Sequence, residues 1–417
     1  MTSVAVFGQG YVGLPLAIAA VQAGHSVIGV DVDPERVRRL CRGESPIGDV
    51  VARDVAEALR TGRYRPTTRA DEIGEPRVFV ITVPTPLREG RPDVSAVRAA
   101  AREIAQHLSQ DATVILESTS YPGTTEEIVG QVIHEEAGLR GGVDYHLAFS
   151  PERIDPGNAR WTLKNTPKLV AGVDDASLVA ATTFYRSFVE TVETVAGVRE
   201  AEFAKLLENT FRQVNIALVN ELLILARDVG VDFREVLRAA ATKPFGYMAF
   251  NPGPGVGGHC LPIDPRYLSW QLERDTGRPS DFISLATSVN DRMPIYVVDR
   301  IADILVSRGS RLEGARVLAL GVTYKADSRD GRESPAVTVI QEATRRGAVV
   351  TALDPIAEDI PTSVRLVRSV DELDLSTIDL GVLLTNHSRH PVNNLAARLP
   401  VVLDTRHELG GENIITL

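Results

Sequence analysis

The chain has 417 residues, of which 44% are hydrophobic and 24% are charged. This balance is typical of a soluble globular protein that is long enough for two or three domains. The net charge of −10 argues against nucleic acid as a partner, although an acidic protein can still hold an anionic ligand in a local basic pocket.

The N-terminal segment is apolar but predicts neither a signal peptide nor a membrane span. Glycines interrupt "MTSVAVFGQGYVGLPLAIAAVQAGHSV" every few residues, and no basic residue precedes the apolar run. The two cysteines, Cys41 and Cys260, are too few for a disulfide framework or a cysteine-based zinc site. We therefore expect a cytoplasmic protein with no membrane partner and no metal.

The first part of the chain alternates β-rich runs with helical patterns. Helices are expected at Leu14–Ala23 and Val94–Leu108, which are rich in Ala and Leu. Near-continuous apolar runs predict the strands of a parallel sheet covered on both faces. These runs lie at residues 3–8, 26–31, 77–83, 112–119 and 146–152. The alternation predicts a doubly wound, Rossmann-like α/β domain, which we place at residues 1–196.

The next part, residues 197–296, predicts a helical central domain. The segment "VREAEFAKLLENTFRQVNIALVNELLILARDVG" has no Pro or Gly before Gly230. Its apolar residues recur at helical spacing, so a long central helix is expected. Residues 233–241 and 280–293 predict two further helices.

A smaller α/β unit completes the chain at residues 297–417. Apolar runs at 316–322, 348–354, 378–385 and 400–406 predict strands, again with helices between them. The expected fold is therefore α/β, with two Rossmann-like doubly wound domains joined by a helical central domain.

A glycine-rich motif follows the first expected strand. Gly8, Gly10 and Gly13 have the spacing that permits a tight turn, the approach of a pyrophosphate and close packing of helix on strand. Asp31 ends the next strand, where an acidic group accepts hydrogen bonds from the ribose of NAD. We predict an NAD site, and Arg36 keeps NADP open as an alternative because it could meet a 2′-phosphate.

Other cofactor contacts are expected from the loops at this edge of the sheet. Tyr11 and Val12 lie between the glycines, and Thr85 and Thr119 follow two later strands. A doubly wound sheet places its ligand contacts at the carboxyl ends of its strands.

The stretch "PGPGVGGHCLPIDP", Pro252 to Pro265, predicts a rigid loop around Cys260. Free cysteines are most often small buried hydrophobes. Here the glycines, His259 and Asp264 instead suggest an accessible niche that favours a thiolate. A hydrolytic Cys/His pair is one interpretation. Oxidation of an aldehyde through a thiohemiacetal and a thioester is the other, and it suits a thiol that accompanies a dinucleotide site.

Six segments in order along the chain resemble the UDP-glucose/GDP-mannose dehydrogenase family of NAD-dependent, four-electron nucleotide-sugar oxidoreductases. They are "GQGYVGLPLA", "ESTSYPGTTE", "FSPERIDPGN", "AKLLENTFRQVNIALVNEL", "PGPGVGGHCLPIDP" and "GVTYKADSRDGRESPA". The chain is most similar to the UDP-N-acetylglucosamine 6-dehydrogenase branch. UDP-glucose, UDP-N-acetylmannosamine and GDP-mannose remain alternative substrates, since their enzymes use the same catalytic residues.

The resemblance implies that the C6 hydroxyl of the sugar is oxidised to a uronate. Cys260 would be the nucleophile, Lys205 and Asn209 would stabilise charge on oxygen, and Asp264 would cooperate with Lys205. Glu152 and Thr119 would act on water. The alternative for Glu152 is a surface salt bridge with Arg153.

The same resemblance implies the remaining contacts and a homodimer or higher homo-oligomer formed through the long helix. Lys325 would reach both cofactor and substrate. The expected substrate-binding residues are Glu152, Arg153, Lys205, Asn209, Gly257, Lys325 and Arg406. Two rival interpretations are a two-electron 3-hydroxyacid or 6-phosphogluconate type dehydrogenase and a non-catalytic NAD-binding regulator. The first needs neither Cys260 nor a third α/β unit.

Overall fold

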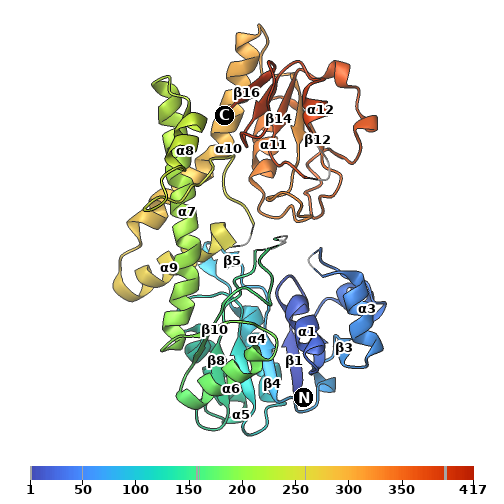
Figure 1. Cartoon of the computed structure of the whole chain (residues 1–417), viewed down its shortest axis with the longest axis vertical. Helices are drawn as coiled ribbons and strands as arrows, with labels where there is room; N and C mark the ends of the chain where they lie inside the picture. The colour runs from blue at the N-terminus through green and yellow to red at the C-terminus, as the bar shows by residue number, and fades with distance from the viewer. Residues whose placement is uncertain (1, 49, 156–157, 159, 259, 389–391) are drawn as a thin grey trace. The chain divides into compact units, whose positions relative to one another are not determined.

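A computed structural model describes residues 2–48, 50–155, 158, 160–258, 260–388 and 392–417 (Figure 1). The chain forms two compact units. Unit 1 comprises Met1–Glu208 and Arg266–Arg278, and unit 2 comprises Asn209–Pro265 and Pro279–Leu417. The mixed α/β fold expected from the sequence is confirmed, whereas the division into three domains at 196 and 296 stays a prediction.

Unit 1 is built on an eight-stranded sheet with the order β10-β9-β8-β7-β4-β1-β2-β3. Neighbouring strands are parallel except for β8 and β9, which are antiparallel. The strands are β1 (Ser3–Phe7), β2 (Ser26–Val30), β3 (Tyr64–Thr67), β4 (Val78–Ile81), β7 (Thr113–Leu116), β8 (His146–Phe149), β9 (Lys168–Gly172) and β10 (Val192–Thr194). A separate hairpin pairs β5 (Leu87–Arg88) with β6 (Arg91–Pro92).

Helices cover both faces of this sheet, which is why its central strands are apolar throughout. Side chains of α1, α2, α3 and α6 pack into one core, and those of α4, α5 and the start of α7 pack into the other. The helices are α1 (Gly13–Gln22), α2 (Pro34–Cys41), α3 (Ala52–Arg60), α4 (Ser95–Ala105), α5 (Gln131–Ala137), α6 (Asp175–Arg186) and α7 (Val198–Asp228). A π-helical segment, η2 (Thr125–Gly130), leads directly into α5.

The strand order sets the position of the ligand-binding edge in unit 1. Strand β1 pairs with β2 on one side and with β4 on the other, so the chain reverses its direction of winding at β1. Loops that follow β1 and β4 therefore diverge at the carboxyl ends of the strands. In doubly wound sheets this crevice is where ligands bind.

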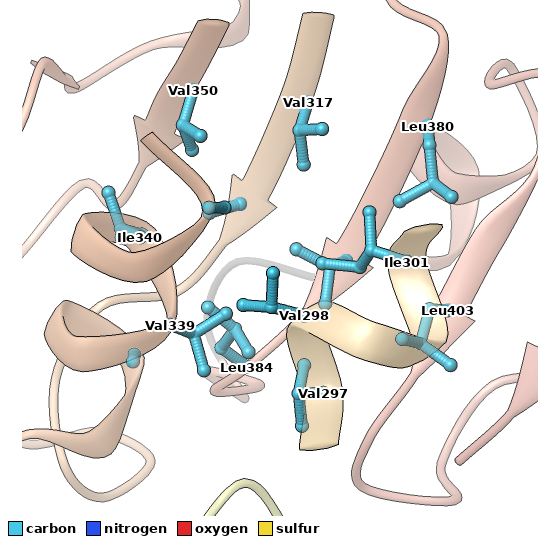
Figure 2. Packing of buried hydrophobic residues seen from close by; sticks show 14 of the residues in the cluster. Val297, Val298, Ile301, Val317, Val339, Ile340, Val350, Leu380, Leu384 and Leu403 are labelled. Carbon is cyan, nitrogen blue, oxygen red and sulfur yellow. The ribbon is translucent and has the colours of Figure 1, made fainter. Parts of the chain in front are cut away.

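Unit 2 contains a six-stranded parallel sheet with the order β13-β12-β11-β14-β15-β16. Its strands are β11 (Arg316–Leu320), β12 (Val349–Leu353), β13 (Leu366–Val367), β14 (Leu380–Leu383), β15 (Val402–Asp404) and β16 (Ile414–Thr416). Helices α10 (Asp281–Ser307) and α11 (Pro335–Arg345) pack on one face, and α12 (Asn393–Ala396) packs on the other. Figure 2 shows Val298 and Ile301 of α10 among side chains of the strands, including Val317 and Leu380.

Among the described residues, three helices lie wholly within the expected central region, and two of them contain residues of both units. These are α7, the eight-residue α8 (Phe233–Ala240) and α9 (Cys260–Thr276). The expected long helix is confirmed, since α7 runs for 31 residues and ends just before the Gly230 that the sequence marks as its limit. No helix among the described residues is long and apolar enough to cross a membrane.

Two features differ from the sequence expectations. Helix α10 continues through Pro294, so the expected boundary at 296 lies inside a helix. A proline in a helix interior removes one backbone hydrogen bond; here Pro294 is itself buried in the apolar interior of the unit, whose packing stabilises the helix. The outer strands β3, β9, β10, β13 and β16 were not predicted, because they are short and only partly apolar.

Candidate active site

The glycine motif forms the turn between β1 and α1, and its three glycines have different surroundings. Gly8 has φ +94°, and a Cβ there would lie 2.5 Å from the carbonyl oxygen of Thr82. A Cβ on Gly13 would overlap the carbonyl oxygen of Gly8. Around Gly10, by contrast, no atom lies within 4 Å of an added Cβ. Two glycines therefore permit close packing, and the third leaves backbone open to a ligand, as a pyrophosphate requires.

Asp31 is held directly against this turn. Its side chain is 3% exposed, and its carboxylate accepts hydrogen bonds from the backbone N–H of Gln9 at 2.7 Å and of Asp33 at 2.9 Å. Arg36 donates to the same carboxylate at 2.9 Å. Asp31 thus fixes the glycine turn as well as carrying the negative charge expected at a ribose site.

The two threonines predicted at the cofactor edge lie together. Thr85 follows β4 and donates a hydrogen bond to the backbone oxygen of Thr119, which follows β7, at 2.7 Å. Tyr267, fully buried, donates to the backbone oxygens of Thr85 and Pro86 at 2.5 and 2.9 Å. The sequence analysis missed Tyr267, whose only signal is an aromatic residue just after the cysteine motif.

Cys260 is the first residue of helix α9, which corrects the expectation of a loop throughout Pro252–Pro265. Prolines suit the first turn of a helix, because the first four backbone N–H groups have no partner inside the helix. Pro262 lies in this turn, and Pro265 follows it. The side chain of Cys260 is exposed, so the thiol is accessible rather than a core residue. His259 lies outside the described residues.

Asp264 lies one helical turn after Cys260 and contacts helix α7. The amide of Asn209 donates a hydrogen bond from Nδ2 to Oδ2 of Asp264 at 2.6 Å, and the two residues are 4% and 5% exposed. Lys205 is one turn before Asn209 on α7 and is 7% exposed. Burial of an ammonium is unfavourable unless it serves a specific contact. The structure thus brings Asn209 and Asp264 together, as the resemblance implies.

The stretch before Cys260 is anchored by buried amides that the sequence analysis did not identify. Asn220 on α7 accepts the backbone N–H of Gly253 at 2.9 Å and donates to the side chain of Asn290 on α10 at 3.0 Å. Asn290 in turn donates to the backbone oxygen of Gln213 at 3.2 Å. A possible sequence signal is two Asn side chains on the apolar faces of helices, where each needs a polar partner.

The glycines of this stretch pack against segments of the last α/β part. A Cβ on Gly257 would lie 2.6 Å from Pro335, and one on Gly258 would lie 2.7 Å from the ring of Tyr324. A Cβ on Gly253 would lie 3.0 Å from the guanidinium of Arg406. Close packing is therefore one reason for these glycines, and a substrate contact of Gly257 stays a prediction.

Lys325 and Arg406 lie in two loops that follow strands of unit 2. Lys325 is partly exposed, and its loop is held by His387, whose Nδ1 accepts the backbone N–H of Asp327 at 3.0 Å. Nε2 of His387 lies 3.0 Å from Asp354, and both side chains are buried. Arg406 donates from Nε to the backbone oxygen of Leu384 at 2.6 Å.

Glu152 does not form the salt bridge with Arg153 that was the alternative interpretation. Arg153 pairs with Glu208 at 2.8 Å and donates to the backbone oxygen of Pro167 at 2.7 Å. The Oε1 atom of Glu152 accepts the backbone N–H groups of Arg153 and Ile154, each at 2.6 Å. The carboxylate is therefore fixed by local backbone in the loop after β8.

Two buried glutamates near these loops were not identified from the sequence. Glu202 on α7 accepts the backbone N–H of Thr125 at 2.9 Å and its hydroxyl at 2.7 Å, and burial raises the pKa of Glu202 to about 7. Burial likewise raises the pKa of Glu117 to about 7, although Lys168 opposes the shift. Glu117 is the first residue of the "ESTSYPGTTE" motif, and Glu202 binds Thr125 within it. The motif was interpreted through its hydroxyl groups alone.

Comparison with known proteins decides the family. The models of the UDP-glucose/GDP-mannose dehydrogenase family match residues 2–189 with the NAD binding domain, 199–292 with the central domain and 318–410 with the UDP binding domain. A UDP-N-acetyl-D-mannosamine dehydrogenase of Pyrococcus horikoshii is 35% identical over 376 residues, which cover 90% of this chain and 88% of that protein. The chain belongs to the UDP-glucose/GDP-mannose dehydrogenase family.

Other relatives of this dehydrogenase agree on the reaction class. A UDP-N-acetyl-D-glucosamine 6-dehydrogenase of Pseudomonas aeruginosa is 35% identical over 354 residues, covering 84% of this chain and 82% of that protein. The solved structure of a UDP-D-ManNAc dehydrogenase from Pyrococcus horikoshii superposes with a TM-score of 0.88 at 32% identity, covering 99% and 98% of the two chains. This protein is an NAD-dependent oxidoreductase of nucleotide sugars, as the sequence predicted.

The surroundings of the glycines predict opposite results for two substitutions. Gly10→Ala should leave the midpoint of thermal unfolding unchanged, because its Cβ meets no protein atom. The added methyl group should nevertheless raise the KM for NAD at least about tenfold, by obstructing the approach of a pyrophosphate. Gly13→Ala should instead lower the unfolding midpoint, because its Cβ overlaps backbone. An unchanged KM in a folded Gly10→Ala protein would contradict this account of the cofactor site.

Proposed function

We propose that this dehydrogenase oxidises the C6 hydroxyl of a UDP-linked 2-acetamido sugar to the carboxylate, with UDP-N-acetylglucosamine as the first candidate. The relatives that support this class act on acetamido sugars: 35% identity is found both to a glucosamine enzyme and to a mannosamine enzyme. The observation that carries the mechanism is the hydrogen bond between Asn209 and Asp264, which joins α7 to the first turn of the helix that begins at Cys260.

The overall reaction is a four-electron oxidation. One nucleotide sugar, one water and two NAD⁺ give one uronate, two NADH and three protons. The turn formed by Gly8, Gly10 and Gly13, with Asp31 beside it, would hold NAD, which would supply a hydride acceptor for both oxidations. The protein supplies the remaining chemistry, which is the covalent capture of the aldehyde, the stabilisation of charge on oxygen and the activation of water.

Cys260 is the proposed nucleophile. Its sulfur adds to the C6 aldehyde to give a thiohemiacetal, whose oxidation leaves a thioester on the enzyme. The first residue of a helix is a favourable position for a thiolate, since the helix dipole and unpaired backbone N–H groups stabilise negative charge there. Its exposed side chain supports the same role.

Lys205, Asn209 and Asp264 are the proposed polar groups at the reacting carbon. A buried ammonium and an amide donor stabilise an oxyanion more strongly than solvated groups would. Because Asn209 donates to Asp264, its amide is held in one orientation and its carbonyl oxygen is directed away from the carboxylate. Asp264 is the proposed proton acceptor that works with Lys205.

Glu152 is the proposed base for hydrolysis of the thioester. Two backbone N–H groups hold its Oε1, which leaves Oε2 to accept a proton from the attacking water. Thr119, whose backbone oxygen binds Thr85, is the proposed second contact of that water.

The UDP moiety is assigned to residues of unit 2. Lys325 and Arg406 both lie within residues 318–410, which match the UDP binding domain of the family. A diphosphate requires cations, and an acidic protein must supply them locally. The cytoplasm remains the proposed compartment, where nucleotide sugars and NAD are both present.

Removal of the thiol tests the covalent mechanism. Cys260→Ser should lower uronate formation about a hundredfold or more, because an alcohol does not form the reactive thioester. The other cysteine, Cys41, is also exposed, so Cys41→Ser is the matched control and should keep full activity. The measurement is NADH absorbance together with chromatography of the sugar product. Undiminished uronate formation by Cys260→Ser would rule out the thioester.

A panel of nucleotide sugars tests the substrate. UDP-N-acetylglucosamine, UDP-N-acetylmannosamine, UDP-glucose and GDP-mannose should be compared by kcat/KM with NAD in excess. We expect the two acetamido sugars to be preferred by at least about tenfold, since one buried polar contact gives that much discrimination. A preference for UDP-glucose would overturn the substrate class, and no turnover with any sugar would favour the non-catalytic regulator.

We further propose that a second copy of this chain covers one face of α7. Four of its apolar side chains are 40–52% exposed and follow one another at intervals of seven, four and three residues, which is the spacing of a helix-pairing seam. They are Phe211, Leu218, Leu222 and Leu225. Such a row of exposed apolar residues on one helix is typical of a protein–protein interface.

The proposed homodimer should dissociate when charged residues replace apolar residues of this row. Leu218→Glu combined with Leu225→Glu should halve the molar mass measured by light scattering, because buried carboxylates would face each other across the interface. Val179 on α6 is also exposed, at 65%, and Val179→Glu is the control that should not change the mass. A wild-type protein that is monomeric at micromolar concentration would contradict the proposal.

A further inference from the structure

A buried group of charged and polar side chains lies beside Glu152, and the proposed reaction has not used it. Its members are Glu117, which directly follows β7, Lys168, the first residue of β9, and Tyr185 on α6. They are 1%, 3% and 0% exposed. Fully buried carboxylates and ammonium groups are rare and unfavourable unless they are paired, so this cluster requires an explanation.

The antiparallel direction of β9 puts Lys168 at the catalytic edge of the sheet. Strands β8 and β9 pair Ala148 with Gly172 and Phe149 with Ala171. The same register, continued by three residues, places Glu152 opposite Lys168. A parallel strand would begin at the far edge, so the one antiparallel pair of this sheet is what brings a strand-initial lysine to the carboxyl ends of β7 and β8.

Lys168 contacts both glutamates. Its Nζ lies 3.1 Å from Oε1 of Glu117 and 3.6 Å from Oε2 of Glu152, and it donates to the backbone oxygen of Pro151 at 3.1 Å. The ammonium also lies 5.2 Å from the ring centre of Tyr185, within the range of a cation–π contact. The hydroxyl of Tyr185 donates to Oε1 of Glu117, so the same oxygen atom contacts Tyr185 and Lys168.

The two oxygens of Glu152 differ in their contacts. Oε1 is held by two backbone N–H groups, whereas Oε2 is buried and has no hydrogen-bond partner among the described residues. Among the described residues, the only cation with a contact to Oε2 is Lys168. Arg153, next to Glu152 in the sequence, pairs with Glu208 instead. Lys168 thus lies close to Oε2 without forming a hydrogen bond with it.

The charges of the cluster also link Lys168 to Glu152. One ammonium lies between two carboxylates, and burial makes a second negative charge unfavourable. Burial raises the pKa of Glu117 to about 7, with Lys168 opposing the rise, the charge of Glu152 adding to it and Tyr185 opposing it. Near neutral pH Glu117 therefore holds a proton for part of the time, and Glu152 is the other acidic residue in contact with Lys168.

We propose that Lys168, held by Glu117 and Tyr185, is a positioning residue that keeps Oε2 of Glu152 directed to water for hydrolysis of the enzyme thioester. This inference rests on the proposed function, since it assigns a supporting group to the base of that reaction. Lys168 neither gives nor takes a proton. Water transfers a proton to Oε2 as its oxygen bonds to the acyl carbon, and the carbon–sulfur bond then breaks with its electron pair passing to Cys260.

The test separates hydrolysis from the two oxidations by stopped-flow measurement of NADH. In Lys168→Met a rapid burst of two NADH per active site should be followed by a steady rate at least about tenfold below wild type, because only the base for hydrolysis is impaired. The matched control is Lys164→Met. Lys164 lies four residues earlier and is 74% exposed, with a surface partner, Glu190, at 3.8 Å. This control should retain the wild-type rate.

A second variant covers the case in which Lys168→Met fails to fold. The double variant Glu117→Gln and Lys168→Met removes both partners of the buried ion pair, which preserves folding better than removing one. It should show the same burst and slow steady rate. A folded double variant with a steady rate within twofold of wild type would overturn the proposal. So would a slow rate without a burst, because that result indicates a general structural defect.

Failure of this inference is distinguishable from failure of the proposed function. If the thioester mechanism itself is wrong, Cys260→Ser enzyme will form uronate at the wild-type rate. If only the role of Lys168 is wrong, wild-type enzyme will give two NADH per sugar and the variants will turn over at its rate.

Discussion

The hydrogen bond between Asn209 and Asp264 is the interaction on which the proposed site depends. It joins the long helix α7 to the first turn of α9, one turn from the thiol at the start of that helix. Both side chains are almost completely buried, so neither can exchange its partner for bulk water without cost. Helix α7 also contains Lys205. Its Asn220 accepts a hydrogen bond from the backbone N–H of Gly253, in the stretch before Cys260. Buried amides therefore fix the segments on both sides of Cys260, the proposed nucleophile.

A second constraint is the direction of the strands in unit 1. Parallel strands bring their following loops to one edge, which gathers the glycine turn, Asp31, Thr85, Thr119 and Glu152 there. The antiparallel β9 adds a buried lysine to that same edge. The residues proposed for cofactor binding and for hydrolysis thus lie at the same edge of one sheet.

Local sequence signals predicted much of the fold and the position of the glycine turn. Continuous apolar runs located the central strands, and the absence of Pro and Gly located α7. The spacing of Gly8, Gly10 and Gly13 predicted a tight turn and close packing, which the surroundings of Gly8 and Gly13 show, while the pyrophosphate contact of Gly10 stays a prediction. Long-range features were not predictable in the same way. The helical start at Cys260 was obscured by its prolines, and the pairing of Lys168 with Glu117 depends on a strand direction that a short, mixed segment does not reveal. Arg153 likewise pairs with Glu208, a residue 55 positions away.

In the proposed mechanism the sugar becomes covalently attached to Cys260 before the uronate is released. Acid quenching of Glu152→Gln enzyme during turnover, followed by mass spectrometry of the peptide that contains Cys260, tests this most directly. Without its base for hydrolysis the enzyme should accumulate the thioester, so the peptide should gain the mass of the acyl nucleotide sugar. A peptide of unchanged mass, from enzyme that has released two NADH per active site, would contradict the account.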